Sequence, residues 1–335
     1  MTGPARGLTR RGLLGAVLAA PLASALSPAL AGCAATDDPA GKLWHGGELT
    51  IGTGNTTGVF YQVGAGYANL VNKYLAGYDA TAAATGGSID NLQRLATGDV
   101  DVALTLAAVA NDAFNGTEGW AGRAQPVRAL ARTYPNYEHV IARTDTRIGT
   151  VAELKGHRVS VGSPGSGTEL IGKRLMAAAG LDPATDLTAL SMSLPQTTAA
   201  ILRGDIDAMI WSGGLPTPGI VDLFAGAHGD VRFLRIQELL PKVDQKYPNL
   251  MTEATIPKSA YGLAEDVPAL TDANLLVVHQ DMPADLAYAL TKLLFDYQRE
   301  LAVVHPAVNS IHRDSAAVTD PVPLHPGAQR YYQPG

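Results

Sequence analysis

Two segments that lie far apart in the chain repeat one pattern, and this repeat constrains the fold more than any other feature. Residues 95–103 read Leu-Ala-Thr-Gly-Asp-Val-Asp-Val-Ala, and residues 202–208 read Leu-Arg-Gly-Asp-Ile-Asp-Ala. In both, a helix end is followed by glycine, the preferred helix C-cap, and then by the apolar run of a buried strand. The pattern indicates one α/β unit in each half of the chain, and not a solenoid of many repeats.

Hydrophobic periodicity predicts the remaining elements of an α/β fold. Strands are expected at 48–52, 101–106, 158–162 and 206–211, and helices at 59–75, 89–95, 151–157, 169–179, 198–203 and 284–305. We expect lobe 1 to comprise residues 47–140 and 275–335, and lobe 2 residues 141–274. A cleft between two such lobes is a preferred place for a small ligand.

The N-terminal 46 residues resemble an export signal followed by a tether. Arg10-Arg11 precede an uncharged apolar stretch, which is typical of twin-arginine signals, and Leu30-Ala-Gly-Cys33 resembles a bacterial lipobox. We therefore expect residues 1–32 to be removed, Cys33 to carry lipid, and residues 33–46 to form a flexible tether. The protein is then expected on the outer face of the membrane or in the periplasm. An uncut transmembrane helix is the alternative, against which Pro21 and Pro28 argue.

Charge and composition exclude several functions. Loss of the three arginines within residues 1–32 would change the net charge from −6 to −9. A general nucleic-acid surface needs a basic excess, so no nucleic-acid partner is expected. The eight histidines and the single cysteine show no metal-ligand spacing, and neither a metal nor a cofactor is expected. We expect a monomer.

Four glycine-rich turns are the candidate binding elements, because each follows an expected strand. Main-chain amides at the helix start after such a turn suit an anion. The spacing at 52–58 is one residue too long for a dinucleotide fingerprint, and Thr168 replaces the lysine of a phosphate-binding loop. The candidate ligand-binding residues are Gly54, Asn55, Thr56, Thr57 and Tyr61; Thr85, Gly86, Gly87, Ser88 and Asn91; Ser163, Gly165, Ser166, Gly167 and Thr168; and Gly213, Gly214, Pro216 and Thr217.

The chain also resembles a known family. Residues 51–61, 84–92, 154–168, 214–217 and 323–332 resemble, in order and at full length, the TAXI family of substrate-binding subunits of tripartite ATP-independent periplasmic (TRAP) transporters. The resemblance implies a periplasmic-binding-protein fold of two lobes joined by crossing strands. It also implies a TRAP-type integral membrane partner and an acidic ligand such as glutamate or a dicarboxylate. Phe60 and residues 55–57 depart from the family pattern.

Three alternatives remain open at this stage. A sensory subunit on the same fold would bind the same ligand, and an enzyme would use Ser166 or an acid of the cleft, although Ser166 lacks a G-x-S-x-G frame. No catalytic residues are expected. For the anion, the alternative to main-chain amides is an arginine clamp, with Arg132 as its candidate.

Overall fold

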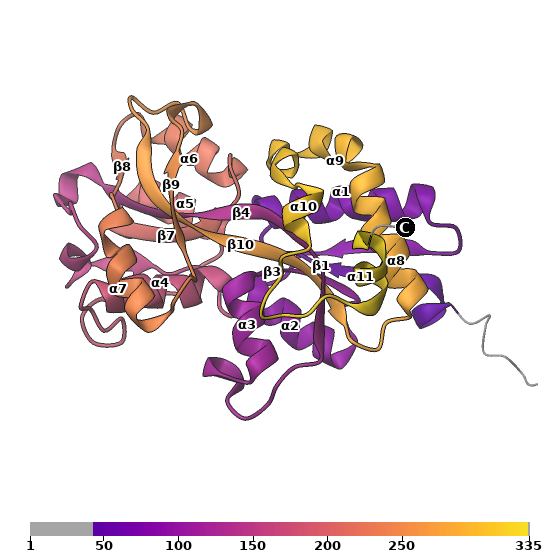
Figure 1. The fold of residues 1–335 in the computed structure, drawn as a ribbon. Coiled ribbons are helices and arrows are strands. Elements are labelled where there is room, and N and C mark those ends of the chain that lie inside the picture. Colours follow the sequence, from indigo (N-terminus) through magenta and orange to yellow (C-terminus); the bar gives the residue numbers. More distant parts are fainter. Residues whose placement is uncertain (1–42, 334–335) are drawn as a thin grey trace, which may run out of the picture. The chain divides into compact units, whose positions relative to one another are not determined.

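The computed structural model describes residues 43–333. The expected signal, Cys33 and most of the tether lie outside these residues. The described part contains a ten-stranded sheet whose main path runs β2-β1-β3-β10-β4-β7-β5-β6, with β8 paired to β4 and β9 to β10 (Figure 1). No helix within 43–333 is long and apolar enough to cross a membrane.

The first lobe is built on three parallel strands. β1 pairs with β2 and β3, and helices follow all three strands. The elements are β1 (Glu48–Gly52), α1 (Val59–Tyr74), β2 (Asp79–Ala83), α2 (Ser88–Thr97), β3 (Val102–Leu106) and α3 (Ala107–Asn115). Carboxyl ends of parallel strands gather at one sheet edge, so the turns after β1 and β3 lie close together.

The second lobe repeats this arrangement around β5, which pairs in parallel with β6 and β7. Its elements are β5 (Arg158–Ser160), α4 (Gly167–Ala178), β6 (Thr188–Leu190), α5 (Leu194–Arg203), β7 (Ala208–Gly213), α6 (Pro218–Ala227), β8 (Val231–Phe233), α7 (Leu240–Lys246) and β9 (Thr252–Ile256). The glycine caps expected from the repeat are confirmed: Gly98 and Gly204 both adopt left-handed conformations, with φ of 82° and 76°.

Two long antiparallel strands pass from lobe to lobe, β4 (Val127–Arg143) and β10 (Val267–His279) (Figure 1). One end of β10 pairs with β3 and its other end with β9, while β4 continues onto β7. The expected lobe limits at 140/141 and 274/275 fall inside these strands, and the division of the chain into lobes at those residues stays a prediction.

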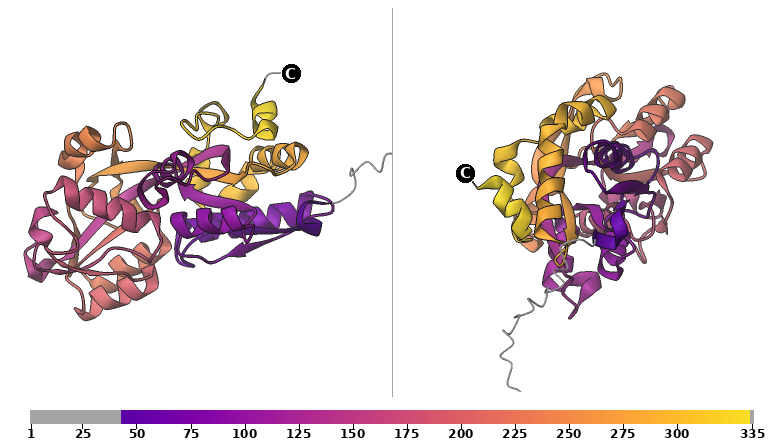
Figure 2. Two further views of the ribbon diagram at one scale, coloured as in Figure 1. Left: turned by 90° about the horizontal axis from the view of Figure 1, so that it is seen from below. Right: turned by 90° about the vertical axis from the view of Figure 1, so that its right-hand side faces the viewer.

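The C-terminal helices pack against the first lobe, where α8 and α9 contact α1. They lie beside the indigo first-lobe elements in all views (Figures 1 and 2). These helices are α8 (Ala284–Asp296), α9 (Gln298–Val304), α10 (Arg313–Ala316) and α11 (Pro326–Tyr332). Short 3-10 helices occupy Trp44–Gly47, Glu118–Trp120, Thr144–Thr146, Ala152–Leu154, Gln237–Leu239, Lys258–Ala260 and Pro306–Ser310.

Several expected elements were wrong in extent. The single helix at 284–305 is divided at Tyr297, whose φ of −114° and ψ of 20° are not helical. The short helix at 151–157 is only a 3-10 turn. The strand expected at 206–211 begins at Ala208. Asp207, just before it, bonds Arg158 through its carboxylate.

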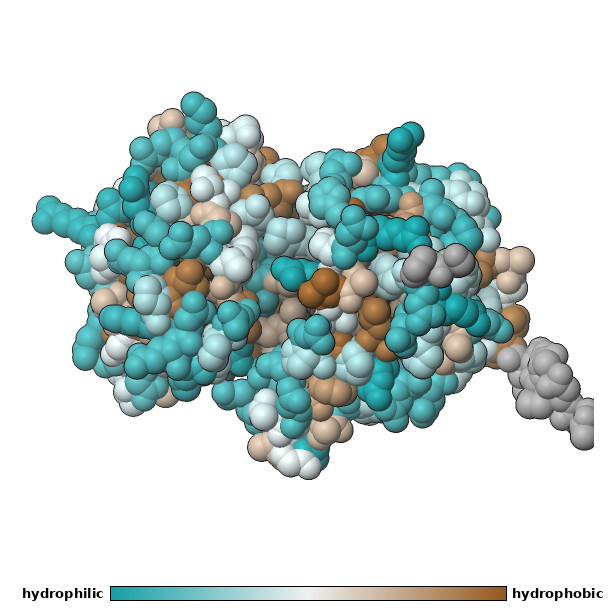
Figure 3. Space-filling model, viewed as in Figure 1, coloured by the Kyte–Doolittle hydropathy of each residue, from teal (hydrophilic) through white to brown (hydrophobic). Residues whose placement is uncertain are grey.

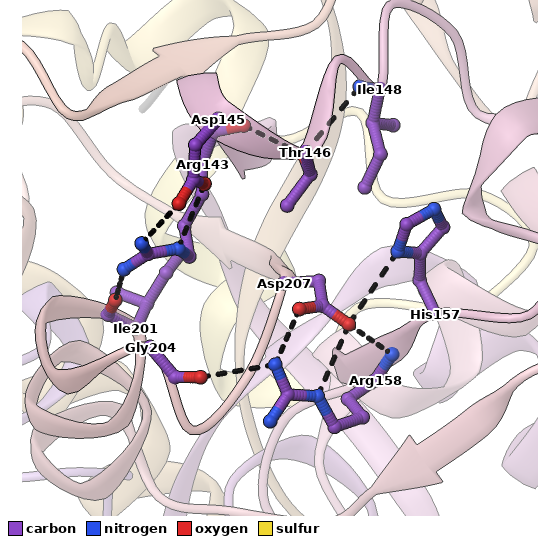
Figure 4. Close-up of polar contacts among 9 residues, drawn as sticks. All are labelled: Arg143, Asp145, Thr146, Ile148, His157, Arg158, Ile201, Gly204 and Asp207. Carbon is purple, nitrogen blue, oxygen red and sulfur yellow. Dashed lines mark hydrogen bonds and ion pairs between the residues drawn. The ribbon is translucent and has the colours of Figure 1, made fainter.

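Asp207 joins the starts of β5 and β7. Its carboxylate accepts bonds from the backbone and side chain of Arg158, at 2.8 and 2.5 Å, and lies 3.5 Å from His157 (Figure 4). In the first lobe Asp101 accepts a bond from the backbone of Thr50 in the equivalent way, at 2.8 Å. Both acids hold neighbouring strands in register, as expected for structural and not catalytic carboxylates.

Candidate functional site

A cavity of about 40 Å³ lies where the turns of the two lobes meet. It is lined by residues that follow β1 and β2, by the last residues of β3 and β7, and by the first residues of α1, α2 and α4. The lining residues are Gly54, Asn55, Gly58, Val59, Phe60, Gly86, Gly87, Ser88, Leu106, Asn136, Ser166, Gly167, Thr168, Trp211, Ser212, Gly213 and Gly214. No charged side chain lines this cavity among the described residues.

Three helices begin at the cavity wall. Their N-cap residues are Gly58 for α1, Gly87 for α2 and Ser166 for α4. The first amides of a helix have no acceptor inside it, and the helix dipole places partial positive charge there. Gly87 has a φ of 116°, which favours glycine and turns the chain into α2. The cavity therefore offers amide donors from both lobes.

Hydroxyl groups add further donors. Three cavity hydroxyls each accept a bond from a backbone N–H: Ser88 from Leu106 (3.1 Å), Ser166 from Glu169 (3.0 Å) and Thr168 from Ser212 (3.2 Å). A hydroxyl that accepts in this way keeps its own proton to donate. All three groups can thus donate to a negatively charged ligand.

A buried polar network lies behind the cavity on the crossing strands. Asn136 donates to Ser212 at 3.3 Å, Ser212 donates to Glu138 at 2.9 Å, and Asn274 donates to Asn136 at 2.7 Å. Burial, reinforced by nearby Asp272, raises the pKa of Glu138 well above its usual range. Burial therefore favours the neutral form of Glu138, which repels an anion in the cavity less than a carboxylate does.

The remaining wall is apolar, formed by Val59, Phe60, Leu106 and Trp211. Trp211 is 8% exposed, and its indole N–H donates to Thr217 at 3.3 Å, which holds the ring in place. An apolar wall opposite a set of donors suits a ligand with an anionic head and a short carbon body.

Direct hydrogen bonds join the lobes at the cavity rim. The side chain of Asn55 in lobe 1 accepts a bond from the backbone of Leu194 at 2.5 Å and donates to Ser163 at 3.1 Å, both in lobe 2. The carbonyl of Gly165 accepts bonds from the amides of Ile89 and Asp90, at 3.1 and 3.0 Å. The structure is thus a closed form of the cleft.

Ten of the sequence-predicted residues line the cavity and nine do not. The ten are Gly54, Asn55, Gly86, Gly87, Ser88, Ser166, Gly167, Thr168, Gly213 and Gly214. Of the others, Asn91 bonds the carbonyls of Thr53 and Leu104 and holds the hydroxyl of Thr85, while Ser163 and Gly165 form the rim. Thr217 orients Trp211, Thr57 accepts a bond from the amide of Gly219, and Pro216 accepts one from His305. Thr56 is exposed, and Tyr61 lies outside the cavity.

Arg132 does not line this cavity and lies in a different hollow. The sequence analysis also missed the cavity residues Phe60, Leu106, Asn136, Trp211 and Ser212. Asn136 lies in β4, which was not expected, and Ser212 lies one residue past the end of the strand expected at 206–211. Across residues 43–333, no group of three or more His, Cys, Asp or Glu side chains is placed to hold a metal ion.

Asp272, on β10, makes stability depend on pH. Burial raises the pKa of Asp272 from 3.8 to about 7, so the folded protein holds a proton that the unfolded chain releases. We therefore expect the contribution of Asp272 to the free energy of unfolding to be largest below pH 4. This contribution should be lost as the pH rises through about 7. In Asp272→Asn this fall should become smaller, whereas exposed Asp314→Asn should leave it unchanged. Urea unfolding at pH 5 and pH 8 measures the difference, and equal slopes in all three proteins would contradict it.

The family model that matches the chain is that of the NMT1-like family, over residues 51–334. The chain is also similar to a binding-protein component of an ABC phosphonate transporter from Pseudomonas aeruginosa, with 14% identity, 78% of each chain covered and a TM-score of 0.54. A second similar structure is PhnD1 from Prochlorococcus marinus in complex with methylphosphonate, with 12% identity, 79% and 91% coverage and a TM-score of 0.52.

These similarities confirm the fold class, a periplasmic-binding-protein-like α/β fold with two lobes. They correct the resemblance to the TAXI family. The matching model is the NMT1-like family, and the Pseudomonas structure belongs to an ABC transporter. Several of the motifs behind that resemblance are glycine-rich turns between a strand and a helix, which both lobes of this structure contain.

Proposed function

Because the chain belongs to the NMT1-like family and folds around a closed cleft, we propose that it is an extracytoplasmic solute-binding protein that is not an enzyme. Its cleft holds one small anion, which the protein delivers to a membrane transport complex. The expected export signal supports work outside the cytoplasm, and anchoring through Cys33 is part of the proposal.

The observation that carries this proposal is the convergence of the starts of α1 and α4, one from each lobe, and of three hydroxyl donors on one cavity that no charged side chain lines among the described residues. A helix start contributes up to ~2 kcal/mol to anion binding, and a hydrogen bond to a charged group about 1.5 to 3 kcal/mol. Four such contacts reach the ~8 kcal/mol of micromolar binding without a salt bridge.

Ser166 supports binding over catalysis. Its hydroxyl is the N-cap of α4 and accepts a bond from Glu169, so its geometry is that of a helix cap. A nucleophilic serine needs a base within hydrogen-bond reach. The buried carboxyl group behind the cavity, Glu138, accepts a bond from Ser212 and not from Ser166. Burial raises its pKa and favours its neutral form.

Acidic amino acids such as glutamate, dicarboxylates and small phosphonates are the ligands that this cleft suits. Each carries an anionic head for the helix starts and a short body for the wall around Trp211. Phosphonate recognition by proteins of the same fold supports the inclusion of that class.

Isothermal calorimetry with L-glutamate, succinate and methylphosphonate tests the proposal. Succinate and methylphosphonate are each matched by an uncharged counterpart, succinamide and dimethyl methylphosphonate. L-Glutamate has no such control, because its diamide keeps the ammonium group and is cationic. We expect at least one anion to bind with micromolar affinity, and its neutral counterpart at least about a hundredfold more weakly, for ~2.8 kcal/mol. Equal binding of a neutral counterpart, or binding of none of the three anions, would contradict the proposal.

A further inference from the structure

A second hollow, of about 380 Å³, is lined by residues of both crossing strands. The residues that line the hollow and those that line the cleft are entirely different. Its walls come from the start of α3 in lobe 1, the segment before β9 in lobe 2, and residues 320–321. Figure 3 shows a face that is hydrophilic over most of its area, with several hydrophobic residues where the two lobes adjoin. The hollow therefore spans the hinge between the lobes.

Arg132 supplies a positive charge to this hollow. Its side chain is exposed, and no carboxylate among the described residues forms an ion pair with it. Arg174, by comparison, pairs with Asp112 at 2.6 Å. A guanidinium in a concave site with free donors is suited to bind a carboxylate in a bidentate manner.

Asp272 lines the same hollow with a carboxylate that lacks one partner. The residue is 3% exposed, and within the described structure its Oδ2 has no hydrogen-bond partner. The backbone amides of Ala108 and Ala273 bond to this carboxyl group. A buried oxygen without a partner destabilises the folded protein, and a donor from a ligand would remove that cost.

The two charged groups do not satisfy each other, since no ion pair joins Arg132 and Asp272. Asp320 adds a second carboxylate to the lining. From these separated, unlike groups we propose that the hollow is a second binding site for a small zwitterion of the α-amino-acid type. The ligand's carboxylate binds Arg132, and its ammonium group binds Asp272, whose carboxyl group releases its proton to solvent as the ligand binds.

Occupancy of this site is linked to the cleft through the hinge. The lining residues belong to both lobes and to both crossing strands, so their spacing changes when the lobes open and close. A ligand that binds the closed spacing better than the open one shifts the protein toward closure by the same free energy. The zwitterion then acts as an effector of solute binding.

Calorimetry with glycine, acetate and glycinamide tests this inference, because the three probes carry both charges, only the negative one and only the positive one. We expect glycine to saturate, and acetate and glycinamide to bind at least tenfold more weakly. Arg132→Gln and Asp272→Asn should each bind one glycine fewer than the wild type. Thr168→Ala, which changes the ligand cleft, should keep that glycine. Circular dichroism and thermal unfolding confirm that each variant is folded.

The stoichiometry separates this site from the cleft. Glycine bound in the cleft alone would be weakened in Thr168→Ala and unchanged in Arg132→Gln, and this result would overturn the inference. Acetate that binds as well as glycine would also overturn it, since the ammonium group would then be unnecessary. Absence of saturable glycine binding in the wild type has the same consequence, and none of these results bears on anion binding in the cleft.

Discussion

Gly167→Val is expected to weaken ligand binding at least a hundredfold while the protein stays folded. A Cβ atom at this first residue of α4 would overlap with Leu106 and lie 2.7 Å from the Ser88 hydroxyl. Both neighbours belong to lobe 1, so the added side chain opposes closure and also blocks the amides at the helix start. A hundredfold loss corresponds to ~2.8 kcal/mol.

Gly226→Val is the matched control for this prediction. Gly226 lies in α6, away from the cleft, and a Cβ there meets Leu202 only at an ordinary distance of 3.5 Å. Calorimetry on both variants, with circular dichroism to verify folding, measures the effect. Wild-type affinity in Gly167→Val would mean that the lobes close without this contact.

Asn55→Ala is expected to weaken binding about tenfold to a hundredfold, through faster release of the ligand. The Asn55 side chain makes bonds from lobe 1 to Leu194 and Ser163 in lobe 2. Each such hydrogen bond contributes about 0.5 to 1.5 kcal/mol, and only the closed form contains them. The variant should therefore lower the population of the closed form.

Stopped-flow measurement of ligand dissociation checks this prediction. Asn309→Ala serves as control, because Asn309 is exposed and distant in sequence from the rim. We expect the dissociation rate to rise in Asn55→Ala with little change in the association rate. An unchanged dissociation rate would show that the rim contacts do not stabilise the bound form.

The sequence predicted the turns of the site better than its walls. Glycines at strand ends are recognisable because the backbone conformation demands them, as at Gly87 and Gly204. Trp211, Ser212 and Asn136 lie within strands, and the face that each occupies depends on how β4 pairs with β7 and β10. That pairing joins residues more than 70 positions apart, and local patterns do not contain it.

The same dependence on strand pairing explains why the sequence suggested Arg132 for the ligand cleft, although it lines a different hollow. Arg132 is close in sequence to Asn136, but it pairs with Leu275 whereas Asn136 pairs with Asp272, across a register shift in the sheet. The shift separates residues that a regular strand would keep together, and it places Arg132 in the hinge hollow. Asn136 lines the cleft and Arg132 lines the hollow, although both belong to β4. Only the register of β4 with β10 distinguishes the two positions.

A crystal structure of the protein with the ligand retained from its source, identified by native mass spectrometry, tests the central claim most directly. The account predicts one small anion in the cleft, with its acidic group within hydrogen-bond distance of the amides of Gly167 and Thr168 and of the Ser88 hydroxyl. A retained ligand that is uncharged, or one whose acidic group lies against Arg132 while the cleft holds no ligand, would contradict it.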